Sequence, residues 1–253
     1  MTPSAIALLV FACVFGGALL GMFLRGVMPD HHLSEDSKEV IKLGMGLIAT
    51  MAALVLGLVI ASAKSAYDTQ EAAVKHTAAK ILLLDRMLAH YGPETRETRA
   101  LLRRTVAARV EAIWPAERAH PARLGTPEAL AAAQGIEARI LQLAPQTDLQ
   151  HWLQDQALQI GSDIAETRWL ILGGLSSVVP MPFLVVVVFW LTIIFGSFGL
   201  FAPRNGTVVA VLFLCALSVA GSIFLILEMG QPFQGLMKIS SAPLRYALSQ
   251  LGQ

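Results

Sequence analysis

Histidine and carboxylate side chains are the groups in this chain that could carry acid–base or metal chemistry, and they are scattered. His31 and His32 precede the stretch Ser34–Asp36, so this segment is either a metal or proton site or a solvated polar loop. The other histidines fall singly at faces and ends of expected helices: His76, His90, His120 and His151. No motif of a zinc protease, serine hydrolase, phosphate loop or dinucleotide fold occurs. We therefore expect no enzyme, no catalytic residue, no cofactor and no metal.

The composition is that of a membrane protein rather than a soluble domain. Of 253 residues, 55% are hydrophobic and 15% are charged, whereas soluble domains carry about 25% charged residues. The charges gather in the middle of the chain and leave long stretches empty, which is typical of membrane-spanning helices. A formal net charge of +1 indicates no nucleic-acid partner. Cys13 and Cys215 lie in separate apolar stretches, which predicts small buried side chains and no disulfide.

Four stretches without charged residues are long enough to cross a bilayer as helices. Three are uninterrupted: Ser4–Leu24, Leu43–Ala63 and Thr207–Leu227. The remaining one, Trp169–Phe201, is too long for one crossing and contains Pro180 and Pro182, which remove backbone donors and disfavour helix before them. We therefore place that crossing at Phe183–Phe201 and interpret Trp169–Val179 as a lead-in segment at the interface or between helices.

The charged middle of the chain, residues 64–168, has apolar residues at steps of three and four and no alternation typical of strands. Its first helix follows the second span without a breaker, so we expect one continuous helix as far as Tyr91. After the last span, a turn rich in Pro and Gly precedes a short helix with an apolar face. That face would dock on the protein or on the bilayer: Leu244, Leu248 and Leu251.

These segments predict an all-α membrane protein with four transmembrane helices and a helical cytoplasmic domain inserted between the second and third. We expect residues 1–63 to form spans one and two with their loop, and 64–168 the helical domain, or stalk. Residues 169–228 would form spans three and four with the lead-in segment, and 229–253 the turn and amphipathic tail helix. Four crossings place both termini and the helical domain on one side. Lys and Arg beside the spans favour the cytoplasm for that side.

The second span carries a stripe of small residues at steps of three and four: Gly46, Thr50, Ala53, Gly57 and Ala61. Close helix packing explains such a stripe, and a pore wall is the alternative. In a pore, Ile48, Met51 or Leu54 would form a constriction that gates by dewetting. Helix packing also explains Gly17 and Gly21 in the first span. No ionisable side chain lies within the four span cores, which argues against a carboxylate-driven transporter.

The chain after the fourth span carries a family resemblance. Phe224-Leu-Ile-Leu-Glu228, followed by Pro232-Phe233-x-Gly235 and Ile239-Ser240, resembles the bacterial DUF4239 family, also called the bestrophin-like domain. The order of elements agrees over essentially the whole chain. Gly230 and Gln234 stand where the family pattern has Asp and Ser. The resemblance singles out the tail residues Glu228, Pro232, Phe233, Gly235 and Ser240.

The resemblance implies a likeness to bestrophins, which are pentameric anion channels whose second helix lines the pore. We therefore expect a homo-oligomer, a pentamer by the resemblance alone, in the cell inner membrane. It would form an ion channel or channel-like pore with the second helix nearest the axis, and its partners would be the lipid bilayer, further copies of itself and ions. One alternative is a non-conducting scaffold or sensor whose helical domain recruits a cytoplasmic partner. An intramembrane enzyme is the third hypothesis.

Overall fold

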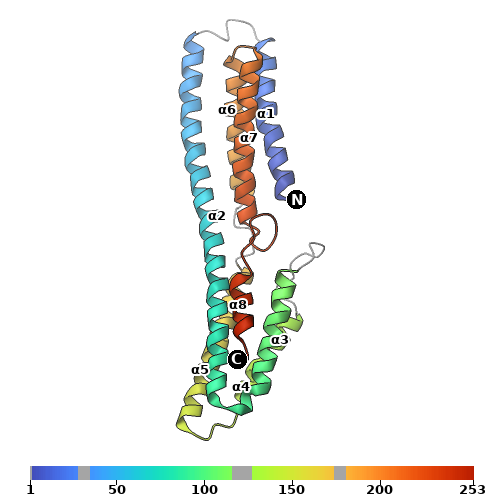
Figure 1. Cartoon of the computed structure of the whole chain (residues 1–253). Helices are drawn as coiled ribbons and strands as arrows, with labels where there is room; N and C mark the ends of the chain where they lie inside the picture. The colour runs from blue at the N-terminus through green and yellow to red at the C-terminus, as the bar shows by residue number, and fades with distance from the viewer. Residues whose placement is uncertain (1, 28–34, 116–126, 174–180) are drawn as a thin grey trace. The chain divides into compact units, whose positions relative to one another are not determined.

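The structure is a computed structural model, and it describes residues 2–27, 35–115, 127–173 and 181–253. Within these ranges all regular structure is helical (Figure 1). The all-α prediction is therefore confirmed. In chain order the elements are α1 (Pro3–Arg25), α2 (Glu35–Tyr91), η2 (Pro93–Thr95), α3 (Arg96–Ile113), α4 (Pro127–Leu141), α5 (Asp148–Gly173), α6 (Met181–Phe201), α7 (Gly206–Met229) and α8 (Ala242–Gln250).

Four helices of the described chain, α1, α2, α6 and α7, are long and apolar enough to cross a membrane. Each contains one of the stretches that the sequence predicts as a span. Side-chain caps help to set where two of them begin, because the first amides of a helix need acceptors. Thr2 Oγ1 accepts from the Ala5 amide at 3.3 Å, and Asn205 Oδ1 accepts from the Val208 amide at 2.8 Å.

The chain divides into two compact units. The membrane unit comprises Met1–Ser65 and Ser177–Gly230, and the helical unit comprises Ala66–Ser176 and Gln231–Gln253. Helix α2 contributes to both, because its 57 residues run without a break, as the sequence predicts for the stretch that ends at Tyr91. At ~1.5 Å per residue it is roughly 85 Å long, well beyond a hydrocarbon core of ~30 Å.

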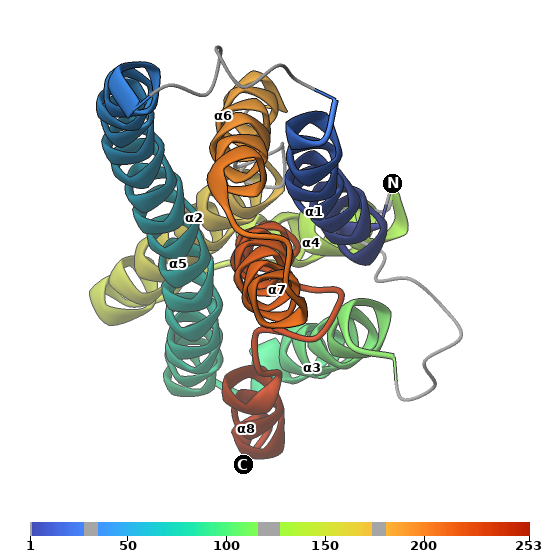
Figure 2. The same ribbon diagram turned by 90° about the horizontal axis from the view of Figure 1, so that it is seen from above.

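The membrane unit is built on α1, which packs against α6 and α7 (Figure 2). Apolar side chains from all three helices form its core, among them Val14, Ala18, Phe195, Ala216 and Ile223. Phe213 on α7 meets Phe11 and Phe15 on α1 edge to face, with ring centroids 5.3 and 5.5 Å apart. The membrane unit therefore has a packed interior of its own, as a helix bundle in lipid requires.

The helical unit has a separate core in which one side of each amphipathic helix is buried. Its members include Ile81 and Leu88 of α2, Leu102, Val106 and Val110 of α3, Ile140 of α4, and Ala157 and Ile160 of α5. The tail contributes Leu244 and Ala247 of α8, and Leu251 directly after it, to this core. Of the two docking surfaces that the sequence left open for the tail, the protein is therefore the one observed.

Helix α5 extends further at its C-terminal end than the sequence predicts. It continues past Arg168 to Gly173 because no proline occurs in this stretch, so the first part of the expected lead-in segment is helical and belongs to α5. The rest of that segment, and Pro180, lie outside the described residues. At its start, Leu149 and Trp152 are exposed, while Leu153 and Ala157 carry the buried face.

Candidate functional site

The small-residue stripe lies on the exposed side of α2. Gly46, Thr50, Ala53, Gly57 and Ala61 are all exposed, and we call this side the outer face of α2. On the opposite side of the helix, Ala52 and Ala63 are buried, with 3% and 0% of their surface exposed. The five residues share one face because steps of three and four nearly complete one helical turn of 3.6 residues. The structure therefore brings the candidate pore-lining residues together on a surface that the protomer leaves uncovered.

Thr50 is the only member of the stripe with a polar side chain. Its hydroxyl donates to the Leu47 carbonyl at 2.8 Å, within the same helix. This bond satisfies the donor and leaves the oxygen lone pairs available on the exposed face. Thr50 is thus the one position of the stripe that offers a side-chain acceptor to an ion, a water molecule or a neighbouring helix.

Glycines of the membrane unit fall into two groups that differ in what surrounds them. A Cβ on Gly21 of α1 would overlap the Gly196 carbonyl, and one on Gly199 of α6 would overlap the Ala18 carbonyl. A Cβ on Gly17 would lie 2.9 Å from Thr192. On α2, in contrast, a Cβ on Gly46 or Gly57 would meet nothing within 4 Å. Gly17, Gly21 and Gly199 therefore serve close packing within the protomer, whereas Gly46 and Gly57 of α2 face open space, as do Gly16 of α1 and Gly221 of α7.

The three candidate constriction residues do not share one face. Leu54 is 73% exposed and Met51 is 47% exposed, whereas Ile48 is only partly exposed and lies nearer the buried side. Met51 and Leu54 belong instead to a row of large apolar residues beside the stripe: Leu43, Leu47, Met51, Leu54 and Leu58. We call this row the leucine row. Sequence reasoning missed it, although its steps of three and four were a usable signal.

Two arginines bind backbone carbonyls at one end of the membrane unit. Arg204 Nη2 donates to the Met22 carbonyl at 2.7 Å, near the end of α1. Arg25 Nη1 donates to the carbonyl of Ala202, just after α6. Each cation thus meets carbonyls at the C-terminal end of a helix, where the helix dipole favours positive charge. These charges belong to helix ends, and the stripe itself is uncharged.

The family-motif tail is held against α3 by aromatic and backbone contacts. Phe233 is 5% exposed and meets Trp114 edge to face, with ring centroids 5.8 Å apart. Trp114 Nε1 donates to the Ile239 carbonyl at 2.8 Å, and the Ile239 amide donates to the Pro232 carbonyl at the same distance. Gly235 has a φ of 79°, a left-handed conformation that favours glycine. The Pro-Phe-x-Gly motif therefore shapes a closed turn that docks on Trp114.

The two remaining tail residues flank this turn. Glu228 is 4% exposed in the last turn of α7 and has an interaction partner. Ser240 is exposed, and its Oγ accepts from the Ala242 amide at 3.2 Å, at the start of α8. Ser240 therefore caps the start of α8, and Glu228 is a buried carboxylate at the end of α7.

The histidines remain apart where the structure describes them. His76 and His90 lie on α2 and His151 on α5. The suggested site at His31, His32 and Ser34 lies outside the described residues, as does His120, and so do the side chains of Glu35 and Asp36. In the described ranges, no three His, Cys, Asp or Glu side chains gather in an arrangement that could hold a metal ion.

Comparison with known proteins relates the whole chain to membrane proteins. A family model described as the Bestrophin-like domain matches residues 12–244. A crystal structure of a membrane protein superposes with a TM-score of 0.63 at 13% sequence identity, and the match covers 96% of both chains. At that identity the likeness shows the fold alone. No curated protein matches the chain.

Proposed function

Since the chain belongs to the bestrophin-like domain family, we propose that it assembles into a homo-oligomeric, channel-like pore with the membrane part of α2 nearest the axis. The family and the fold make it a multi-pass membrane protein. Beyond this, we propose that the chain crosses the membrane four times, that α2 lies nearest the axis and that ions pass through the pore. The family resemblance further suggests a ring of five subunits. It includes no catalytic step.

The observation that carries this proposal is the contrast between the two groups of glycines. Small residues allow helix backbones to approach closely, and in lipid this is their main contribution to packing. On α1 and α6 the protomer itself uses that property, because Gly21 and Gly199 lie against backbone carbonyls. Gly46 and Gly57 of α2 have no such neighbour. At Gly46 and Gly57, a helix from another copy would be able to approach the α2 backbone closely, or several copies of α2 would be able to surround a narrow axis.

The chemistry of α2 fits a pore without fixed charge. Its membrane part has no ionisable residue between Lys42 and Lys64, so selectivity by a charged ring is not available within it. The leucine row beside the stripe presents bulky apolar side chains on an exposed surface. Around a narrow axis such side chains exclude water, and a small rotation of α2 would exchange them for the small residues and Thr50. We therefore propose hydrophobic gating through Met51 and Leu54.

Planar-bilayer recording of the purified oligomer tests conduction, with the subunit number measured beforehand by the mass of the assembly in nanodiscs. Thr50→Lys places a charge on the outer face of α2, and we expect it to abolish the conductance or to change its ion preference. The matched control is Ser218→Lys on α7. Ser218 is also exposed and its hydroxyl also donates to a carbonyl of its own helix, at 3.0 Å.

Three results would contradict parts of this proposal. A monomeric particle in nanodiscs would contradict the assembly. A correctly assembled oligomer that stays silent would contradict the pore, and a stoichiometric soluble partner in a pull-down would then favour a scaffold. A lysine near mid-membrane costs ~3 kcal/mol in either helix. If Thr50→Lys and Ser218→Lys changed the conductance equally, this shared cost would explain both effects. That result would contradict the placement of α2 nearest the axis.

A further inference from the structure

The side of α5 that faces away from the core is acidic and carries a tryptophan. Its exposed residues recur at steps of three and four and form what we call the acidic face of α5: Asp148, Trp152, Asp155, Gln159, Ser162 and Glu166. The three carboxylates form no ion pair within the described ranges. Asp163, in contrast, lies outside this face and forms an ion pair with Lys80, whose Nζ is 2.5 Å from Asp163 Oδ2. Trp152 is 54% exposed, so a large apolar surface lies among these carboxylates.

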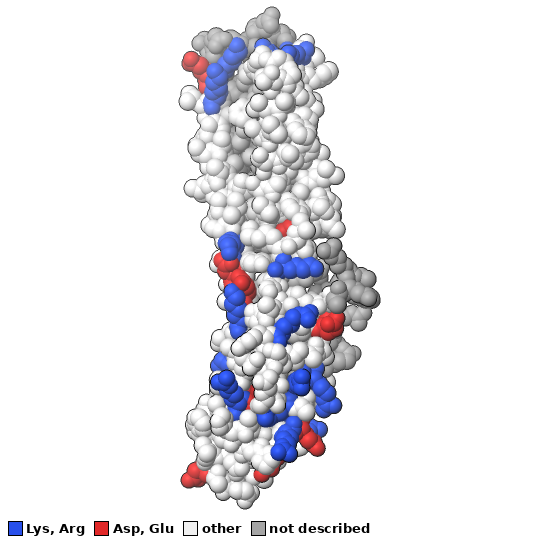
Figure 3. Space-filling view, in the orientation of Figure 1, with Lys and Arg blue, Asp and Glu red and all other residues white. Residues whose placement is uncertain are grey.

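The exposed side of α3 has the opposite charge. Arg96, Arg103 and Arg104 are exposed there, and Ala100 lies between them. We call this surface the basic face of α3, and Figure 3 shows Lys and Arg side chains gathered over it. Its acid Glu97 is already paired with Arg139 of α4 at 3.0 Å. In the described part of the chain, none of the three arginines has a carboxylate partner.

Within the helical unit, α3 and α5 both pack against α4. In Figures 1 and 2, α3 lies to one side of α2, and α5 crosses behind α2 from its other side. This placement matters for assembly, because a ring of identical subunits joins one flank of each copy to the opposite flank of the next. Such a head-to-tail contact requires two different, complementary surfaces. An acidic face and a basic face on two different helices of the same unit meet that requirement.

We propose that the acidic face of α5 packs against the basic face of α3 of a neighbouring copy. The inference rests on the proposed oligomer and names its contact outside the membrane. Opposite charges set the pairing and its register, and Ala100 leaves room for Trp152 to be buried between guanidinium groups, where stacking of Arg on Trp is favourable. A lone buried tryptophan surrounded by charged pairs is a common centre of protein interfaces.

Cross-linking of the full-length protein tests the contact. Cys13 and Cys215 lie on the membrane helices α1 and α7 and are exposed there, contrary to the prediction that they are buried, and both are first replaced by Ser. Ala100→Cys and Leu149→Cys then place one thiol on α3 and one on the exposed turn of α5 just before Trp152, and a short bis-maleimide joins thiols that lie close together. We expect the chain with both cysteines to give a covalent ladder up to the full ring. Each single-cysteine chain should stay monomeric on the gel, and two single-cysteine chains expressed together should give dimers and nothing larger.

Charge reversal tests the chemistry of the same contact. Asp155→Arg and Arg103→Asp, each alone, should abolish the ladder, and the two together in one chain should restore it. Glu137→Arg is the control, because Glu137 is an exposed acid on α4 outside both faces, and it should leave the ladder unchanged. A merely misfolded variant would not be rescued by a second charge reversal.

The assembly mass in nanodiscs separates failure of this inference from failure of the proposed function. An oligomer that gives no ladder would overturn the α5–α3 contact and leave the pore proposal standing. Self-cross-linking of either single-cysteine chain would also overturn it, because the contact would then be symmetric and not head-to-tail. A monomer would overturn the oligomer and this contact together.

Discussion

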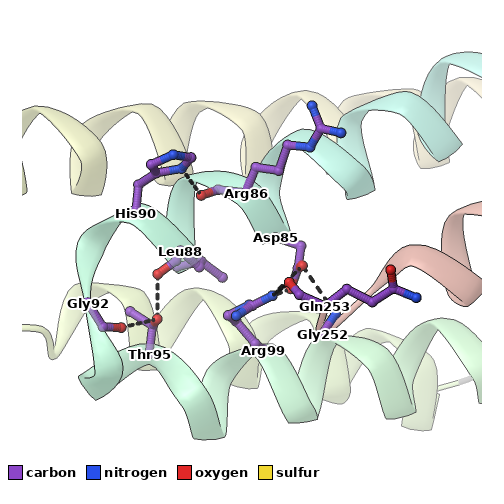
Figure 4. Close-up of polar contacts among 9 residues, drawn as sticks. All are labelled: Asp85, Arg86, Leu88, His90, Gly92, Thr95, Arg99, Gly252 and Gln253. Carbon is purple, nitrogen blue, oxygen red and sulfur yellow. Dashed lines mark hydrogen bonds and ion pairs between the residues drawn. The ribbon is translucent and has the colours of Figure 1, made fainter.

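Asp85 is a buried carboxylate of α2 whose two oxygens both have partners (Figure 4). Arg99 of α3 donates from Nε to Oδ1 and from Nη2 to Oδ2, each at 2.8 Å, and the Gly252 amide approaches Oδ2 at 3.3 Å. The hydrogen bond to Asp85 raises the pKa of Arg99, against the opposing effect of partial burial. One ion pair thereby joins α2, α3 and the tail.

Breaking this pair from one side should destabilise the helical unit. Asp85→Asn keeps the side-chain shape and removes the charge, so the Arg99 side chain, only 18% exposed, becomes an unpaired cation. We expect the free energy of unfolding to fall by about 3 kcal/mol, measured by chemical unfolding in detergent with tryptophan fluorescence. Arg86→Gln, at an exposed neighbour without an ion pair in the described ranges, should change it little. Equal stability of the two variants would argue against a role for the pair.

Asp163 of α5 provides a pH-dependent contribution. Hydrogen bonds from Lys80 and Gln159 lower the pKa of this carboxyl from its ordinary value of 3.8. A carboxyl with a depressed folded pKa stabilises the fold above its unfolded pKa, and the contribution is lost as the pH falls through the folded value. We expect wild type to exceed Asp163→Asn in thermal stability by a constant amount above about pH 5 and to lose this advantage below about pH 4. An advantage unchanged down to about pH 2 would contradict the assignment.

At the scale of elements, the crossing of α1 and α6 depends on backbone contact that only glycine permits. A Cβ on Gly199 would overlap the Ala18 carbonyl, so Gly199→Ala must push the two helices apart. We expect a loss of about 1–3 kcal/mol, the usual penalty for overpacking, seen as a lower melting temperature in detergent. Gly46→Ala is the matched control on α2, where a Cβ meets nothing within 4 Å. If both variants melted alike, the packing contrast behind the pore proposal would be lost.

The helices could be predicted from the sequence because their signals are local. Uncharged stretches marked the four membrane-capable helices, and the absence of a breaker after Lys64 predicted the continuous α2. The tail motif identified the family correctly, as the match over residues 12–244 shows. The sequence did not show that Arg168–Gly173 continues α5, and the lead-in segment was therefore predicted as separate from that helix. Glycine and proline mark where a helix can end, but whether it ends there depends on what it packs against.

The candidate site was only half predictable, because periodicity shows which residues share a helix face and does not show what covers that face. The five residues of the stripe from Gly46 to Ala61 are all exposed on α2, and their role in a pore stays a prediction. Ile48 was grouped with Met51 and Leu54, yet it lies nearer the buried side. Leu149 and Trp152 look like core residues by type and are exposed. Which apolar face is covered depends on distant segments, and no local pattern records them.

At the scale of the whole molecule, α2 links the membrane unit to the helical unit through one continuous face. Ala52 and Ala63 are buried on the same side of the helix as Ile81 and Leu88, and the residues opposite are exposed along its length. Both stretches belong to one unbroken helix of 57 residues. If the proposed gating rotates α2, we expect the rotation to extend beyond its membrane-spanning part.

The number of crossings decides which parts of the chain share a side of the membrane. Under the proposed four crossings, Gly206 at the start of α7 would lie on the side of the membrane opposite the helical unit, and the positive-inside rule predicts the cytoplasm for the helical unit. In a chain without Cys13 and Cys215, we expect Gly206→Cys to react with an impermeant maleimide in intact cells. Ser162→Cys on α5 should react only in inverted vesicles. Reaction of both in the same preparation would contradict four crossings, and the reverse pattern would contradict the orientation while leaving the crossings intact.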